Sequence, residues 1–250
     1  MTKNQKLIVG NWKMNPESLN EAREIFSGIS EGLTKNKKAA VVICPSFAHL
    51  APLAEMKKDN LILGAQDVSG EPKGAFTGEV SAAMLKDLGA SYVIVGHSER
   101  RKAGETNDSI NKKILLVLKS GLMPILCVGE SERNDDGRHL MVVREQIEKA
   151  LAGMEKKRLP SLVVAYEPVF AIGAATAMEA RDVHEMILFI KKVIVEMFKL
   201  KTADGLTVLY GGAVDGANAK GILTVGAADG LLVGRQSLDP KSFLDIIACA

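Results

Sequence analysis

Apolar residues along the chain fall into short unbroken runs, separated by longer segments in which they recur at helical spacing. Short apolar runs bounded by turn residues predict β-strands. The runs are Lys6–Gly10, Ala40–Cys44, Leu61–Ala65, Ser91–Val95, Met123–Val128, Leu162–Tyr166, Leu206–Tyr210 and Gly230–Val233. The amphipathic segments include Ser18–Leu33, Glu79–Leu88, Asp108–Ser120, Leu140–Gly153 and Ala177–Leu200. The pattern predicts a strand–helix unit repeated about eight times.

The predicted strands are continuously apolar, which is typical of parallel strands buried on both faces. Roughly eight such units in 250 residues fit a closed barrel, so we predict an α/β fold with a single (β/α)8 barrel domain over residues 1–250. A doubly wound sheet is the competing topology. It normally carries a glycine-rich dinucleotide loop after its first strand, whereas here the first strand runs into Asn11, Trp12 and Lys13.

Composition narrows the class of protein. The 32 basic and 30 acidic residues nearly cancel and form no basic stripe with aromatic residues, so no nucleic-acid partner is expected. Cys44, Cys127 and Cys249 are odd in number and widely spaced, which predicts neither disulfides nor a metal site and indicates a cytoplasmic location. The first apolar run is too short for a signal peptide or a membrane span, so no membrane association is expected.

Two strands end on side chains that suit proton transfer. Leu162–Tyr166 leads into Glu167, and the following Pro168 restricts the backbone there. Ser91–Val95 leads, one glycine later, into His97. A fixed carboxylate and a fixed imidazole can remove a proton from carbon and polarise the adjacent carbonyl. Taken alone, Glu167 could be a surface carboxylate in a turn and His97 a hydrogen-bonded structural residue.

Other polar and glycine residues also follow predicted strands. They are Asn11, Lys13, Glu99, Gly211, Gly212, Gly234 and Arg235. In a parallel barrel the carboxyl ends of the strands share one face, where barrel enzymes have their active sites and the last two loops commonly bind phosphate. The pair Gly211-Gly212 allows a close approach of an anion to the backbone, and Lys13 can supply positive charge.

Several motifs together resemble the triosephosphate isomerase family over nearly the whole chain. They are Gly10–Asn15, Gly64–Asp67, Lys73–Glu79, Val95–Arg101, Cys127–Glu130, Ala165–Val169, Ala171–Gly173, Leu209–Gly212 and Ser237–Pro240. The resemblance implies a TIM barrel and an aldose–ketose isomerase of glycolysis and gluconeogenesis, an intramolecular oxidoreductase. Its substrates would be D-glyceraldehyde 3-phosphate and dihydroxyacetone phosphate, interconverted through an enediolate without metal or organic cofactor.

The resemblance also implies roles for individual residues. Glu167 would be the base that carries the proton between the two carbons, and His97 the neutral electrophile that polarises the carbonyl. Lys13 would stabilise the enediolate and the phosphate, and Asn11 would add a hydrogen bond. In supporting roles, Glu99 would partner the lysine and Ser98 would contact the resting base.

A homodimer is implied as well, through the loop formed by residues 66–79. Thr77 stands at the position that, in the family, reaches towards the partner's active site. Asp67 occupies a position where many relatives have asparagine, so the contacts of this loop are expected to differ.

The chain departs from the family pattern around the phosphate and the lid. Phe170 replaces a tryptophan, and about three residues are missing after Gly173, at the hinge of the lid loop. Ala213 replaces a serine whose hydroxyl is expected to bind phosphate, and Arg235 replaces a glycine beside the phosphate position. The expected phosphate-binding residues are Gly173, Gly211, Gly212, Ala213, Gly234 and Arg235.

These departures leave alternatives for the function. The first is a working isomerase with a compact lid, in which Arg235 holds the phosphate. The second is a weakened isomerase that releases methylglyoxal because the enediolate is poorly shielded. The third uses the same mechanism on another sugar phosphate. The fourth is a barrel protein that only binds a ligand or partner. A pure binder, however, has no need of a base opposite an electrophile.

Overall fold

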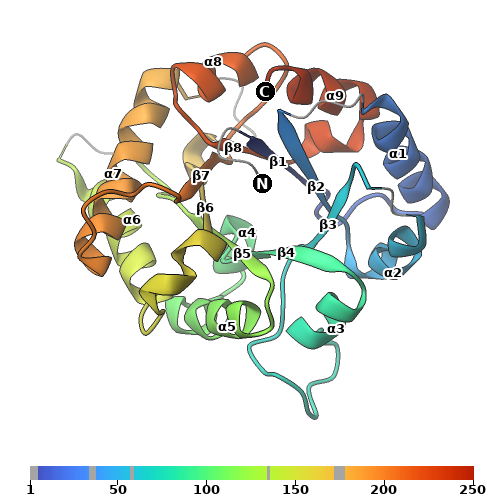
Figure 1. The fold of residues 1–250 in the computed structure, drawn as a ribbon, viewed down its shortest axis with the longest axis horizontal. Coiled ribbons are helices and arrows are strands. Elements are labelled where there is room, and N and C mark those ends of the chain that lie inside the picture. Colours follow the sequence, from blue (N-terminus) through green and yellow to red (C-terminus); the bar gives the residue numbers. More distant parts are fainter. Residues whose placement is uncertain (1–4, 34–37, 57–58, 134–135, 172–177) are drawn as a thin grey trace.

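The protein forms a closed barrel of parallel strands in the order β1 to β8, with β8 pairing back to β1 (Figure 1). The computed structural model describes residues 5–33, 38–56, 59–133, 136–171 and 178–250. The strands are β1 (Lys6–Asn11), β2 (Ala39–Cys44), β3 (Ile62–Ala65), β4 (Ala90–Val95), β5 (Met123–Val128), β6 (Val163–Tyr166), β7 (Thr207–Tyr210) and β8 (Gly230–Val233). The predicted barrel is confirmed.

The helices lie around the strands, most of them in an outer ring and α4 nearer the centre of the view (Figure 1). They are α1 (Leu19–Gly32), α2 (Phe47–Met56), α3 (Ala82–Asp87), α4 (Ser98–Lys102), α5 (Asn107–Lys119), α6 (Arg138–Ala150), α7 (Ala180–Phe198), α8 (Ala219–Thr224) and α9 (Pro240–Ala248). Three short 3-10 helices complete the described part of the chain: η1 (Lys156–Ser161), η2 (Val169–Ala171) and η3 (Arg235–Leu238).

The predicted strands agree with the structure to within one residue at each end, whereas the helix predictions were less accurate. The predicted start at Glu79 was wrong, because Ser81 caps α3 by accepting a hydrogen bond from the backbone N–H of Met84. Helices α2, α4, α8 and α9 were not among the expected segments. Helix α2 contains Pro52, and α4 and α8 are too short for a helical period to be read from the sequence.

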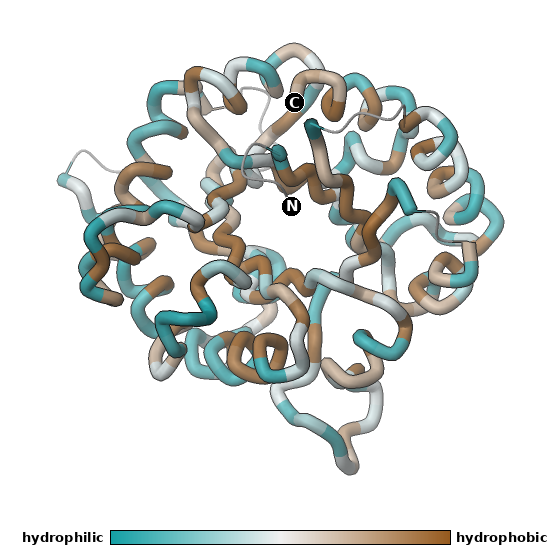
Figure 2. Tube along the Cα trace, in the orientation of Figure 1, coloured by the Kyte–Doolittle hydropathy of each residue, from teal (hydrophilic) through white to brown (hydrophobic). Residues whose placement is uncertain are grey.

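The strands are apolar on both faces because each face meets a separate core. One cluster fills the barrel and includes Leu7, Val42 and Ile125, while a larger cluster lies between the strands and the helices. Figure 2 shows apolar strands at the centre of the molecule, with polar positions mostly on the outer side of the helix ring. This arrangement explains why the strands appear in the sequence as unbroken apolar runs.

The seam between the first and last strands is tightly packed. Leu7 of β1 is in register with Gly230 of β8, and a Cβ atom added at Gly230 would lie 1.9 Å from the Leu7 carbonyl oxygen. Only glycine fits there without moving one of the two strands. Strands from opposite ends of the chain are thus packed directly against each other.

We predict that Gly230→Ala lowers the free energy of unfolding by about 2–3 kcal/mol, because the added methyl group forces the seam apart. Gly221→Ala in α8 is the matched control. An added Cβ there meets no atom within 4 Å, so this change should raise stability by about 0.5–1 kcal/mol through helix propensity. Urea unfolding curves measure both effects. Equal midpoints for Gly230→Ala and the wild type would contradict the packing described here.

Candidate active site

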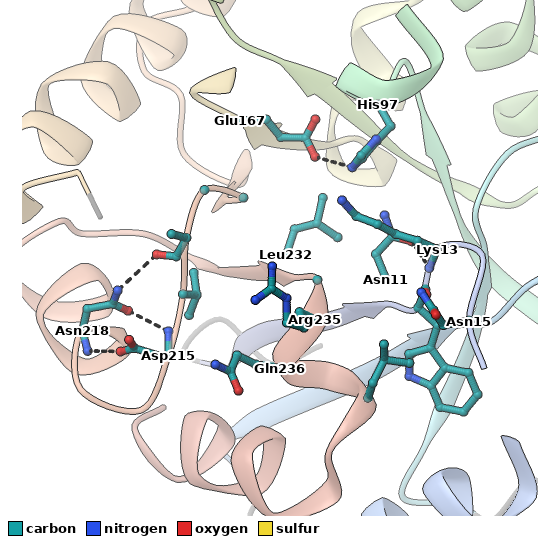
Figure 3. A pocket seen from close by; sticks show the side chains of 17 residues that line it. Asn11, Lys13, Asn15, His97, Glu167, Asp215, Asn218, Leu232, Arg235 and Gln236 are labelled. Atoms are coloured by element: carbon teal, nitrogen blue, oxygen red, sulfur yellow. Dashed lines mark hydrogen bonds and ion pairs between the residues drawn. The ribbon is translucent and has the colours of Figure 1, made fainter. Parts of the chain in front are cut away.

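A cavity of about 450 Å³ opens at the carboxyl ends of the strands (Figure 3). The predicted site residues that line it are Asn11, Lys13, His97, Glu167, Gly211, Gly212, Ala213, Gly234 and Arg235. Ser98 and Glu99 are tied to this set by hydrogen bonds rather than by lining the cavity. Gly173 and the segment where residues are missing relative to the family lie outside the described residues. The structure thus brings together side chains from both ends of the chain.

Glu167 is buried and firmly held at the end of β6. Its Oε1 lies 3.2 Å from Nε2 of His97, and its Oε2 accepts a hydrogen bond from the backbone N–H of Ser98 at 3.1 Å. The backbone N–H of Glu167 donates to the carbonyl of Val128 at 2.8 Å, which extends the β5–β6 pairing by one residue. The carboxylate is therefore directed towards the imidazole and is restrained by the first turn of α4.

The hydrogen bonds of His97 indicate which tautomer is present. Its Nδ1 accepts the backbone N–H of Glu99 at 3.2 Å, so this nitrogen carries no proton. The Glu99 carboxylate is 3.7 Å from Nδ1, beyond hydrogen-bonding distance. The ring hydrogen therefore lies on Nε2, on the side of Glu167. The result is a neutral imidazole that presents an N–H donor towards the carboxylate.

Lys13 has an unusual backbone conformation that is stabilised by side-chain amides. Its φ of 56° is in the left-handed region, which disfavours a residue with a Cβ atom. The Asn11 Oδ1 accepts the Lys13 N–H at 3.1 Å, and the Gln66 Nε2 donates to the Lys13 carbonyl at 2.7 Å and to the Cys44 carbonyl at 3.0 Å. The Lys13 ammonium lies 2.6 Å from Glu99. The predicted Lys13–Glu99 pairing is thus present.

The glycines after β7 are required by crowding as well as by the cavity. A Cβ atom at Gly211 would lie 2.9 Å from Cγ of Glu167, and one at Gly212 would lie 2.3 Å from the Tyr210 hydroxyl oxygen. The sequence suggested only that these glycines let an anion approach the backbone. Their second role is to make room for Glu167 and Tyr210, which no local pattern reveals.

Arg235 places a second cation in the cavity. It begins η3, and Figure 3 shows its side chain extending into the cavity. Within the described part of the chain, no ion pair or hydrogen bond holds its guanidinium group. Gly234 is close to the lysine, since an added Cβ there would lie 3.7 Å from the Lys13 Cε. An anion in the cavity would therefore meet positive charge from two directions.

Buried polar residues behind the cavity complete the environment of Glu167. Cys127 belongs to β5 and is fully buried in the barrel. Burial raises the pKa of its thiol, and the charge of Glu167 and a side-chain hydrogen bond to it raise that pKa further, so the thiol stays protonated. Burial likewise raises the pKa of Tyr166, whose hydroxyl donates to Glu130 at 2.8 Å. No local sequence pattern indicates that Cys127 adjoins Glu167.

The described residues form neither a metal-binding cluster nor a membrane-spanning helix. No cluster of three or more histidine, cysteine, aspartate or glutamate side chains is arranged to hold a metal ion. No described helix has the length and hydrophobicity needed to cross a membrane.

The geometry defines a class of chemistry. A carboxylate faces a neutral imidazole N–H, with an ammonium group nearby, at the end of the barrel where such enzymes bind substrates. This arrangement can take a proton from a carbon atom next to a carbonyl and stabilise the oxyanion that forms. The site is thus that of a barrel enzyme of the proton-transfer type.

Comparison with known proteins identifies the family. A family model described as triosephosphate isomerase matches residues 6–250. The chain is 41% identical over 248 residues to the triosephosphate isomerase of Dictyoglomus turgidum, which covers 97% of this chain and 98% of that protein. It is 43% identical over 244 residues to that of Moorella thermoacetica, with coverages of 96% and 97%. It is 42% identical over 244 residues to that of Roseiflexus sp., covering 96% of each protein.

The chain belongs to the triosephosphate isomerase family. The predicted resemblance and the predicted isomerase class are confirmed.

Proposed function

We propose that the protein interconverts D-glyceraldehyde 3-phosphate and dihydroxyacetone phosphate through an enediolate, as a reaction of glycolysis and gluconeogenesis. The observation that carries the proposal is the Glu167 carboxylate facing the neutral Nε2–H of His97, 3.2 Å away, at a cavity that Lys13 also lines. Membership of the triosephosphate isomerase family supports the choice of substrate.

In the proposed reaction, Glu167 is the catalytic base. It leaves the Ser98 N–H and removes a proton from the carbon next to the substrate carbonyl, and the electron pair of that C–H bond forms the carbon–carbon double bond of the enediolate. The Nε2–H of His97 and the ammonium of Lys13 stabilise the oxyanion, and Asn11 adds polar contact. Glu167 then returns the proton to the adjacent carbon, while the hydroxyl proton moves from the oxygen that becomes the new carbonyl to the oxygen that becomes the new hydroxyl, which completes the isomerisation without net oxidation.

Ser98 and Glu99 have supporting roles in this proposal. The Ser98 N–H holds the resting carboxylate at 3.1 Å, and Glu99 holds both the Lys13 ammonium and, through its backbone N–H, the tautomer of His97. All three contacts come from the first turn of α4. This turn therefore fixes the base, the electrophile and the lysine relative to one another.

The phosphate of the substrate binds, in our proposal, at the loops after β7 and β8. Gly211, Gly212, Ala213 and Gly234 bring backbone close to it. Arg235 supplies a guanidinium group that suits two phosphate oxygens and substitutes for the hydroxyl absent at Ala213. The part expected of Gly173 lies outside the described residues.

The function is tested by following D-glyceraldehyde 3-phosphate with proton NMR, recording dihydroxyacetone phosphate and methylglyoxal in the same tube. We expect conversion by the wild type with methylglyoxal at the background rate. Glu167→Gln should lower kcat by about 10²- to 10⁴-fold, because it removes the base. Glu145→Gln, which changes an exposed residue of α6, should leave kcat unchanged.

Other outcomes of this experiment favour the alternatives. Protein-dependent methylglyoxal would indicate a weakened isomerase that releases its intermediate. The absence of any conversion would contradict the proposed substrate and favour another sugar phosphate. Equal activity of Glu167→Gln and the wild type would show that Glu167 is not the base.

For Arg235, we predict that Arg235→Gln raises KM for the triose phosphate by about 10-fold or more, since hydrogen bonds to charged groups contribute about 1.5–3 kcal/mol. The value of kcat should change little, because the guanidinium holds the phosphate in the ground state and the transition state alike. Lys241→Gln, an exposed change in α9, is the control. An unchanged KM for Arg235→Gln would show that the backbone alone binds the phosphate.

We further infer that the protein is a homodimer. The loop of residues 66–79 projects from the barrel between β3 and α3 (Figure 1). Phe76 in this loop is 47% exposed, and Met14 and Met84 are 92% and 57% exposed. Large apolar side chains exposed in this way are typical of an interface, and in the family this loop enters the neighbouring subunit. Thr77 would then approach the partner's cavity.

The root of this loop is fixed by an ion-pair network that the sequence did not predict. The two carboxylate oxygens of Asp67 lie 2.7 Å from Nζ of Lys113 and 2.7 Å from Nε of Arg100. Glu105 also pairs with Lys113. Burial raises the pKa of Asp67, while its contact with Lys113 opposes that rise. Asp67 thus joins the loop to α4 and α5 within one chain.

Sedimentation velocity tests the dimer. We expect a wild-type mass of about twice the chain mass of 26.8 kDa. Phe76→Asp should shift the protein towards the monomer, because it places a charge in the apolar contact. Leu188→Asp, which changes an exposed apolar residue of α7, should leave the dimer intact. A wild-type monomer at micromolar concentration would contradict the inference.

The cellular location is inferred from the cysteines. All three are free, which supports the expected cytoplasmic location because such thiols persist in a reducing compartment.

A further inference from the structure

Gln146 makes a paired contact with the backbone at the end of β5. It lies on α6, and its side-chain Oε1 accepts the Gly129 N–H at 2.8 Å while its Nε2 donates to the Gly129 carbonyl at 3.0 Å. Both backbone groups of one residue are thus bound by a single amide. This is the pattern by which one strand binds another.

The contact exists because the neighbouring strand has ended. The pairing of β4 with β5 stops at Val95 and Leu126, whereas the pairing of β5 with β6 continues to Val128 and Tyr166. Gly129 follows Val128, so β4 offers its backbone no partner. The Gln146 amide takes the place of the missing strand and satisfies two backbone groups that would otherwise be unpaired.

Gly129 packs directly against the residue that carries the base. A Cβ atom added at Gly129 would lie 1.8 Å from the carbonyl oxygen of Glu167. The backbone on both sides of this contact is also tied to the end of β5, since Glu167 N–H donates to Val128 at 2.8 Å and Val169 N–H donates to Glu130 at 2.9 Å. The position of Gly129 therefore determines where the Glu167 backbone can lie.

We propose that Gln146 is a positioning residue for Glu167, acting through Gly129. Glycine is required at position 129 by the close approach, yet glycine is also the residue whose backbone is least restricted. The two hydrogen bonds from Gln146 remove that freedom. The role in catalysis rests on the proposed function, in which Glu167 removes a proton from substrate carbon.

The expected effect is on the chemical step. Misplacement of a reacting group by about 1 Å can slow a reaction by about 100-fold. The proposed phosphate-binding residues lie on the loops after β7 and β8, away from Gly129, so substrate binding should be preserved. We expect Gln146→Met, which keeps the length of the side chain and removes both hydrogen bonds, to lower kcat about 10-fold or more with KM within about twofold.

Asn111 offers a matched control. Its Nδ2 donates to the carbonyls of Ala150 and Ala152, both at 2.8 Å, so it too binds backbone twice through one side-chain amide. This contact joins α5 to the end of α6 and does not touch the cavity. Asn111→Leu and Gln146→Met should both lower the urea midpoint. Only Gln146→Met should lower kcat. An equal loss of kcat in the two variants would show that Gln146 contributes to the stability of the fold and does not position Glu167.

A second variant separates positioning from a general loss of structure. In Gln146→Glu at high pH, the ionised group accepts the Gly129 N–H but repels the Gly129 carbonyl. The protonated carboxyl group has the donor and acceptor of the native amide. Partial burial and the nearby carbonyl favour the protonated form and raise the pKa of this group. The kcat of the variant relative to the wild type should therefore be low above this pKa and recover as the pH falls through it.

Other charged groups near Gln146 do not account for a pH dependence of the ratio of the two kcat values. Glu99, Arg101, Lys102 and Glu167 line the same space, and they are present in both the variant and the wild type. Their titration is therefore removed to first order when the ratio of the two kcat values is taken. A ratio that stays constant from pH 5.5 to 9, a range of about three and a half units, would overturn the proposal.

Hydrogen exchange gives a readout that does not depend on activity. In Gln146→Met, the amides of Glu167 and Val169 should exchange faster than in the wild type, whereas in Asn111→Leu they should not. If the wild type fails to isomerise triose phosphates but these amides are deprotected, the proposed function fails and the positioning contact stands. Unchanged exchange and unchanged kcat in Gln146→Met would overturn the inference itself.

Discussion

Closure of the barrel determines which loops of this chain meet at the cavity. Strand β8 returns to β1, and Gly230 packs against the Leu7 carbonyl so closely that no side chain fits between them. Because all the strands run parallel, their carboxyl ends form one rim. This rim brings Asn11, near the start of the chain, to the same cavity as Arg235, near its end. Without closure, the cation of the last loop would not face the cations and acids of the first loops.

Within the rim, the groups proposed for chemistry are held by backbone contacts from other elements. Ser98 and Glu99 restrain Glu167 and His97 through their N–H groups, and Gln66 binds the carbonyl of Lys13 in its left-handed conformation. Such fixed dipoles cost little reorganisation when charge develops in a reaction. Arg235 differs, because its guanidinium has no partner among the described residues and is free to meet a ligand. The site thus combines a rigid proton-transfer end with a more adaptable anion end.

Much of the fold and of the site could be predicted from the sequence, for identifiable physical reasons. Strands buried on both faces leave unbroken apolar runs, and residues that follow such runs, such as His97 and Glu167, are placed on one rim by the parallel topology. Contacts of Gln66 and Gln146 could not be predicted, because they join backbone groups many residues away and leave no local pattern. Short helices such as α8 were not predicted, because they contain too few residues to show the helical spacing of apolar positions. The lid segment after Gly173 lies outside the described residues.

If Glu167 carries a proton between two carbons, product formed in deuterated solvent records that transfer. The measurement is a proton NMR spectrum of dihydroxyacetone phosphate formed from D-glyceraldehyde 3-phosphate in D₂O. A carboxyl group that holds the proton exchanges it with solvent, so the account predicts deuterium at one of the two C1 hydrogen positions, and at only one, since the proton returns from a single face. Deuterium at both C1 positions of the first-formed product, or the same rate of deuterium uptake with Glu167→Gln, would contradict the account.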